Sequence, residues 1–163
     1  MQKTTKALSS ILMGFIVLMM ALDAMLLVTS PVWLRAMYEN NGVLFSFPDA
    51  GFYIHRPQGD ERLMLIFVIL SGIALGWILL ETLRLLRRVH LGPFTMATAR
   101  CLRRLAVGST LQMLLFGYKM AFGPTVITLA CAGLFLIGAM LFLVLADLFH
   151  AAAQLKEDNE LTI

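Results

Sequence analysis

Two ionisable residues of opposite charge, Asp23 and Lys119, lie inside long apolar segments of this sequence. A charged side chain within a bilayer is costly, so it usually faces protein or water and marks an ion pair, a relay or an ion path. Each residue follows about 13 residues of its segment, which at 1.5 Å per residue is a depth of roughly 20 Å. One hypothesis is that Asp23 and Lys119 approach each other and join the first and third helices. Alternatively, Lys119 extends to the headgroups and Asp23 lines a small hydrated vestibule.

A second candidate group is a set of arginines on one predicted helix face, Arg100, Arg103 and Arg104, which are three and four residues apart. Thr95 is a good N-cap for that helix. The arginines either anchor the chain on anionic lipid, at about 1 kcal/mol per basic residue, or dock an acidic partner or the chain's own tail. The acidic candidates near the end of the chain are Asp147, Glu157, Asp158 and Glu160.

The elements that hold these residues are predicted to be membrane helices. Hydrophobic residues make up 60% of the 163 residues and charged residues 14%, against about a quarter charged in soluble domains. A transmembrane helix needs about 20 apolar residues, and four segments qualify: 11–29, 63–86, 105–122 and 126–148. The first is too long for a typical signal peptide, so we expect it to be retained. The predicted fold is a single all-α integral membrane domain of four transmembrane helices.

Orientation follows from the lysines and arginines of the short loops. With the amino terminus inside, the basic residues on the inner side are Lys3, Lys6, Arg84, Arg87, Arg88, Arg100, Arg103, Arg104 and Lys156. Those outside are Arg35, Arg56, Arg62 and Lys119. This asymmetry predicts that both termini are cytoplasmic, with a basic cytoplasmic loop at 87–104 and a cytoplasmic tail at 149–163.

The external loop, 30–62, is long for a connection. Its segments 43–47 and 51–55 flank Pro48-Asp49-Ala50 and are predicted to form a small β-hairpin. This cap is either a site for a ligand or signal, or an interfacial plug whose aromatic residues sit among the headgroups.

Small residues predict where helices pack closely. Gly72 and Gly76 have GxxxG spacing, which favours internal packing over dimerisation here, and Gly133 and Gly138 could act similarly. Glu81 can pair with Arg84 at three-residue spacing. After Asp147 the chain stays helix-prone to about residue 157. Asp158-Asn159 is expected to interrupt that helix, so that the last residues either fold back or form a frayed terminus.

No catalytic, cofactor or metal motif is apparent, and we expect no enzymatic activity. Cys101 and Cys131 fall at different predicted depths, so a disulfide is not expected. Direct nucleic-acid binding is not expected either, because lipid headgroups already neutralise the basic patch.

The sequence resembles a family of small bacterial four-helix inner-membrane proteins of unknown function. The resemblance rests on Gly92-Pro93-Phe94-Thr95, on the arginine-rich helix through Leu105, and on the ending from Ala146 to Leu161-Thr162-Ile163. Members are often encoded beside a helix-turn-helix regulator of the Cro/C1 type, which implies a cytoplasmic partner of that class.

Two functional hypotheses follow. The first is a regulatory or signalling membrane protein, with the outer loop as input and the basic loop and acidic tail as output. The second is a small transporter or channel, which would require a homo-oligomer because one bundle of four short helices encloses little space.

Overall fold

The computed structural model describes residues 2–39, 60–89 and 95–161, and in these residues every regular element is an α-helix. The helices are α1 (Gln2–Glu39), α2 (Glu61–Val89), α3 (Met96–Phe122) and α4 (Val126–Leu161). Three of them, α1, α2 and α4, are long and apolar enough to cross a membrane. The predicted hairpin at 43–55 lies outside the described residues.

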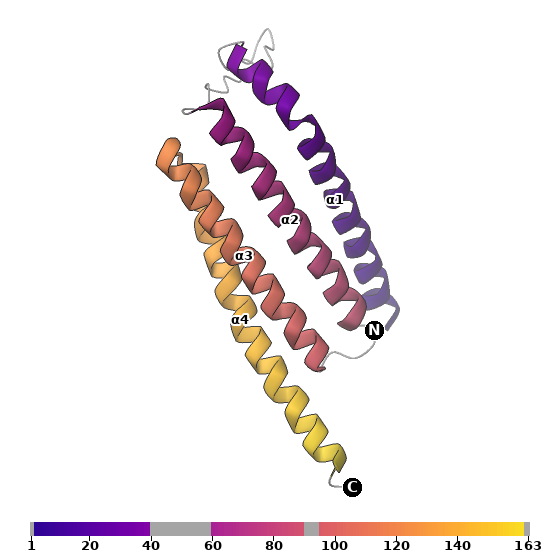
Figure 1. Cartoon of the computed structure of the whole chain (residues 1–163). Coiled ribbons are helices and arrows are strands. Elements are labelled where there is room, and N and C mark those ends of the chain that lie inside the picture. The colour runs from indigo at the N-terminus through magenta and orange to yellow at the C-terminus, as the bar shows by residue number, and fades with distance from the viewer. Residues whose placement is uncertain (1, 40–59, 90–94, 162–163) are drawn as a thin grey trace.

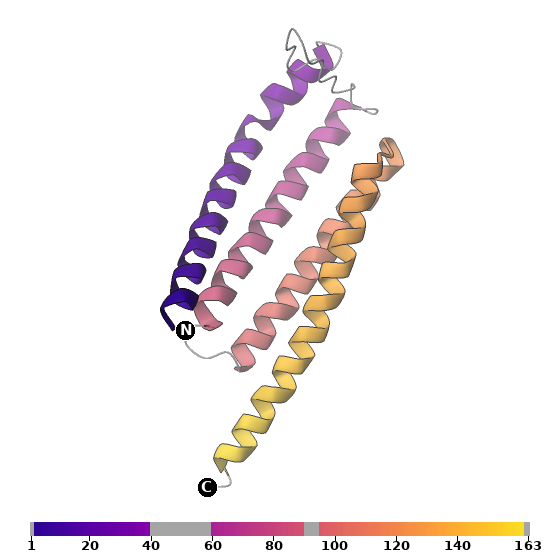
Figure 2. The ribbon, with the colours of Figure 1, turned by 180° about the vertical axis from the view of Figure 1, so that it is seen from behind.

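The helices follow one another as an open series rather than a closed bundle. Among the described helices, α1 contacts α2, α2 contacts α3, and α3 contacts α4, with no contact between α1 and α3 or between α2 and α4. Figures 1 and 2 show α2 between α1 and α3 from both sides. The start of α1 and the end of α4 lie at the same end, which we call the terminal end.

The first helix is longer than predicted, because Pro31 does not end it. α1 continues to Glu39, well into the predicted loop 30–62. Proline lacks the N–H that would bond to the carbonyl of Leu27. The Ser30 hydroxyl donates to that carbonyl instead, at 2.8 Å, and Ser30 is fully buried. The side chain of the preceding residue therefore satisfies the acceptor that proline leaves open.

The predicted start of α3 is confirmed in detail. Thr95 has extended backbone angles, and its hydroxyl accepts from the backbone N–H of Thr98 at 3.2 Å. The helix then continues without a break from the basic segment through the predicted third span to Phe122. α3 is not among the three helices that are long and apolar enough to cross a membrane. It contains the buried polar residues Ser109 and Gln112.

A repeat of small and aromatic residues holds α4 against α3. Ala139, Ala146 and Ala153 are buried at seven-residue spacing, and Phe142 and Phe149 pack on the cluster of Leu102, Leu105 and Ala146. Small and large side chains at alternating positions let the two helices approach closely.

The aromatic packing reaches across three helices at the other end. The ring of Phe116 in α3 meets Phe67 of α2 edge-on and stacks on Phe135 of α4, each at 5.7 Å between ring centroids. Among the described residues no atom lies within 4 Å of a Cβ built at Gly133 or Gly138, so neither glycine marks a close approach of helices there.

The prediction that Asp158-Asn159 breaks the last helix is wrong. α4 continues to Leu161 and projects beyond the ends of the other helices (Figure 1). Gln154, Lys156 and Glu157 are exposed on this projection. Charged and amide side chains of this kind are good helix formers, and one Asp-Asn pair is a weaker signal than the continuous helical sequence before it.

Candidate functional site

A network of charged and polar side chains joins α2 and α3 near the terminal end, and its centre is Glu81. The Glu81 side chain is only 3% exposed. Its carboxylate accepts from Arg84 at 2.6 Å, as the three-residue spacing predicts, and from Arg104 of α3 at 3.4 Å. One buried carboxylate therefore binds two guanidinium groups from different helices.

The third donor to Glu81 is the thiol of Cys101. The Cys101 sulfur lies 3.2 Å from Oε2 of Glu81 and 3.3 Å from its backbone carbonyl oxygen, and Cys101 is 1% exposed. Burial raises the pKa of the Cys101 thiol to about 11, and the neighbouring carboxylate adds to the effect. The thiol therefore stays protonated and acts as a hydrogen-bond donor rather than as a nucleophile.

Local helix geometry explains this placement. Thr95 starts α3 so that Cys101 and Arg104 share the face that meets α2. Arg88, at the end of α2, donates to the carbonyl of Ala97 at 2.9 Å and ties the first turn of α3 to α2. Such a contact fixes both the register and the rotation of α3.

The three arginines predicted to share one face have three different environments. Arg104 binds Glu81, and Arg103 binds Asp147 of α4 at 3.0 Å. Arg100 is exposed, and its Nε donates to the carbonyl of Met96 one turn earlier, at 3.4 Å. The predicted contact of Asp147 with the basic helix is confirmed, but two of the three arginines are engaged within the chain.

The tail acids lie on the projecting part of α4. Glu157 and Asp158 are exposed there, and Glu160 belongs to the same helix. The straight path of α4 carries these residues away from the basic helix (Figure 2). Arg103 pairs instead with Asp147 and Arg104 with Glu81, which are carboxylates nearer the helix interfaces.

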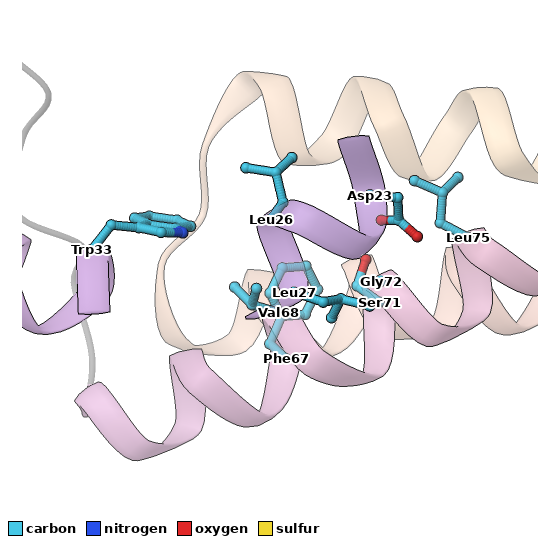
Figure 3. Close-up of a pocket in the computed structure, with 9 residues that line it drawn as sticks. All are labelled: Asp23, Leu26, Leu27, Trp33, Phe67, Val68, Ser71, Gly72 and Leu75. Carbon is cyan, nitrogen blue, oxygen red and sulfur yellow. The ribbon is translucent and has the colours of Figure 1, made fainter. Parts of the chain in front are cut away.

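A second polar location is a groove between α1 and α2 (Figure 3). Its volume is about 190 Å³, and its lining is mostly apolar. Asp23 and Ser71 supply polar atoms toward one end, and Trp33 lies at the other. The indole N–H of Trp33 is buried without a hydrogen-bond partner. The groove therefore combines an apolar wall with one carboxylate, which is a chemistry suited to an amphiphilic cation.

The predicted glycine contact forms one wall of this groove. A Cβ built on Gly72 would lie 2.5 Å from Cδ2 of Leu27, and one on Gly76 would lie 3.3 Å from a carboxylate oxygen of Asp23. The GxxxG pair thus serves internal packing of α2 on α1, as predicted. α2 also binds α3 through Ser71, whose hydroxyl accepts from the amide of Gln112 at 2.5 Å.

Asp23 and Lys119 contact different partners. Asp23 points toward α2 within the groove (Figure 3), whereas the ammonium of Lys119 lies 5.5 Å from the centre of the Phe67 ring. Phe67 also lines the groove. The structure places α2 between the two residues and records no ion pair between them among the described residues.

Residues 28–163 match a family described as "Protein of unknown function (DUF2975)". The chain belongs to this family. The match spans α2, α3 and α4 entirely, and so includes Glu81, Cys101, Arg104 and Asp147. No curated protein and no solved structure matches the chain. The resemblance to a family of unknown function is confirmed, and membership in DUF2975 transfers no activity.

Sequence reasoning missed the centre of the polar network. It assigned Glu81 only a local pair with Arg84 and gave Cys101 no role. One signal was present: Glu81 lies in an apolar segment, and Cys101 and Arg104 follow it on the next helix, 20 and 23 residues later. The interpretation failed because a buried partner depends on which helix faces meet, which spacing within one helix does not determine.

Proposed function

We propose that this protein is a regulatory or signalling component of the bacterial inner membrane that acts through a cytoplasmic partner. In this proposal all four helices span the bilayer, both termini are cytoplasmic, and the terminal end is the inner face. The asymmetry of basic residues supports this orientation. A helix-turn-helix regulator is the partner class that the family resemblance implies.

The observation that carries the proposal is the unbroken length of α4. Its 36 residues correspond to about 54 Å, whereas the bilayer core is about 30 Å thick. α4 packs on α3 and is linked to it by the Arg103–Asp147 pair. A change at the opposite end of α4 can therefore move a projecting polar segment as part of one rigid helix.

Arg100 is the best candidate for direct contact with an acidic partner. Arg103 and Arg104 are held by carboxylates of this chain, but Arg100 is exposed and interacts with its own backbone. The exposed projection, with Lys156 and Glu157, lies on the same side of the membrane in this proposal. Together they form the output surface.

The test is site-specific photocrosslinking in native membranes, with a photoreactive residue at Glu157 and a matched control at Met140. Both positions are exposed on α4, but Met140 lies in the apolar segment. We expect a soluble protein to crosslink at Glu157 and not at Met140, and Arg100→Glu to reduce that product at least fivefold. Lys156→Glu serves as a second charge reversal. If the same soluble products form at both positions, or none forms at Glu157, the proposal fails.

The alternative function is a small oligomeric transporter or channel, and Asp23 is the observation that favours it. A carboxylate in an apolar groove is a typical feature of ion and substrate paths. Reconstituted protein should then pass a cation flux that Asp23→Asn abolishes and Gly117→Ala, a substitution in open space, leaves unchanged. Equal flux in the two variants would remove this alternative.

A further inference from the structure

The face of α4 opposite to α3 carries a second regular repeat, which none of the described residues covers. Its apolar residues alternate at spacings of three and four. The repeat consists of Ile127, Ala130, Leu134, Ile137, Leu141, Val144, Leu148, Ala151 and Leu155. All nine are exposed. We call this set the α4 seam.

The seam has the period of a coiled coil. Apolar residues that repeat every 3.5 positions over four heptads let helices supercoil around one another. With the isoleucine and leucines at heptad position a, the buried Ala139, Ala146 and Ala153 fall at position f. Position f lies opposite the a and d positions, so packing on α3 leaves the seam free.

Lipid alone explains the apolar character of the first part of the seam but not of the last. Asp147 and its partner Arg103 are both more than half exposed and mark the end of the apolar segment. Leu155 lies eight residues further, about 12 Å along the helix. Its neighbours Gln154, Lys156 and Glu157 are exposed and polar.

Beyond Asp147, large exposed apolar side chains persist at the seam positions. Leu148 is 60% exposed and Leu155 is 65% exposed, with the exposed Ala151 between them. Burying a water-exposed leucine of the seam against another helix lowers the free energy, because apolar surface leaves water. The seam therefore continues from lipid into water on one face.

A second copy of this chain is the occupant that fits best. Two copies in one membrane have the same orientation, so their α4 helices are parallel and identical, and the seam is self-complementary across a two-fold axis. The flanking positions Ala152 and Gln154 are uncharged. Asp147, at flanking position g, is charged, but in a parallel pair it meets the uncharged Ala152 of the other copy, so the flanking positions place no like charges opposite each other. Within the apolar segment the seam is flanked by Gly133 and Gly138, which have open space around them and permit close approach.

The area is also sufficient. A leucine side chain buries on the order of 100 Å². Nine seam positions, of which seven are large, then bury on the order of 700 Å² per copy, close to the roughly 800 Å² per partner of a stable interface. Leucine at a with isoleucine or valine at d also suits clusters of more than two helices.

We propose that the α4 seam is the interface through which copies of this protein associate as a parallel homo-oligomer. The proposal does not depend on the regulatory role. It requires only that copies share a membrane, and it places the projecting ends of α4 side by side.

The test is disulfide crosslinking in native membranes. The background carries Cys131→Ala and Cys101→Ser, because serine retains a hydrogen-bond donor to Glu81. Leu148→Cys and Leu155→Cys lie on the seam. Leu143→Cys and Glu157→Cys are matched controls, each at heptad position c and each exposed. Copies of two lengths are expressed together so that a product between copies is recognised by its mass.

We expect mixed-length disulfides to form at least tenfold faster at the two seam positions than at their controls. A second measurement uses the chain with its native cysteines. There the double substitution Leu148→Asn/Leu155→Asn should reduce co-isolation of the two lengths at least fivefold. Equal rates at seam and control positions would overturn the proposal. So would adducts at Leu155→Cys whose mass shows another protein, or seam variants that co-isolate as well as the parent.

Discussion

The polar network around Glu81 allows a prediction in which removing a charge is less harmful than removing its partners. Glu81→Gln keeps the size and an acceptor for Cys101 but loses the two charge-assisted hydrogen bonds. Arg84 and Arg104 have side chains that are 54% and 58% exposed, so water can solvate them again. We expect a cost of about 1–2 kcal/mol in the free energy of unfolding.

The double variant Arg84→Ala/Arg104→Ala removes both cations and keeps the carboxylate. The Glu81 carboxylate, 3% exposed, then remains buried and charged without a cation. Leaving one member of a buried pair without compensation costs about 3–5 kcal/mol. Adding Glu81→Gln to the double variant removes the uncompensated charge, so the triple variant should recover at least about 2 kcal/mol of that loss.

The assay is reversible unfolding in detergent with increasing mole fraction of a denaturing surfactant. A second readout is the rate at which a maleimide labels Cys101 in a Cys131→Ala background, because that thiol is buried against Glu81. The double variant should label fastest and Glu81→Gln should stay close to the parent. If Glu81→Gln is as unstable as the double variant, or the triple variant is no more stable than the double, the burial of charge does not control this site.

Three further predictions address packing, capping and the exposed ion pair. Gly72→Val should push α1 away from α2 and lower the free energy of unfolding by about 1–3 kcal/mol through overpacking. Gly117→Val should be close to neutral, because a Cβ at Gly117 meets no atom within 4 Å. The same unfolding assay compares the two variants. Thr95→Ala should cost about 1 kcal/mol through loss of the cap of α3, measured by unfolding and by earlier proteolysis in the first turn of α3. Arg103→Ala should change stability by less than about 1 kcal/mol, because both it and Asp147 are largely exposed, and a larger loss would show that this pair is more shielded than its exposure indicates.

Elements whose cause lies within one helix could be predicted from the sequence. The cap at Thr95 and the pair of Glu81 with Arg84 follow from local spacing and composition, and the structure contains both. The glycine contact of α2 was also predicted as internal packing. In each case the interacting groups lie on one helix or require only a smooth patch on it.

Features that depend on helix order could not be predicted in the same way. An Asp23–Lys119 pair needs α1 beside α3, but the helices are arranged so that α2 lies between them. Depth in the membrane gives the height of a charge and not the face of the bundle it occupies. The continuation of α1 past Pro31 depended on one hydroxyl, that of Ser30, whose role as a replacement donor is a property of the folded helix.

The open order of the helices restricts how any signal can cross this protein. Because α1 contacts α2 alone among the described helices, a change at the α1–α2 groove can reach α4 within one chain only through α2 and α3. Three polar links among the described residues connect α2 with α3: Ser71 with Gln112, Glu81 with Cys101 and Arg104, and Arg88 with the carbonyl of Ala97. The first is adjacent to the groove, since Ser71 also lines it, and the second lies beside the Arg103–Asp147 link to α4. A rotation of α2 that breaks the first link would therefore also change the distances at the second, around Glu81.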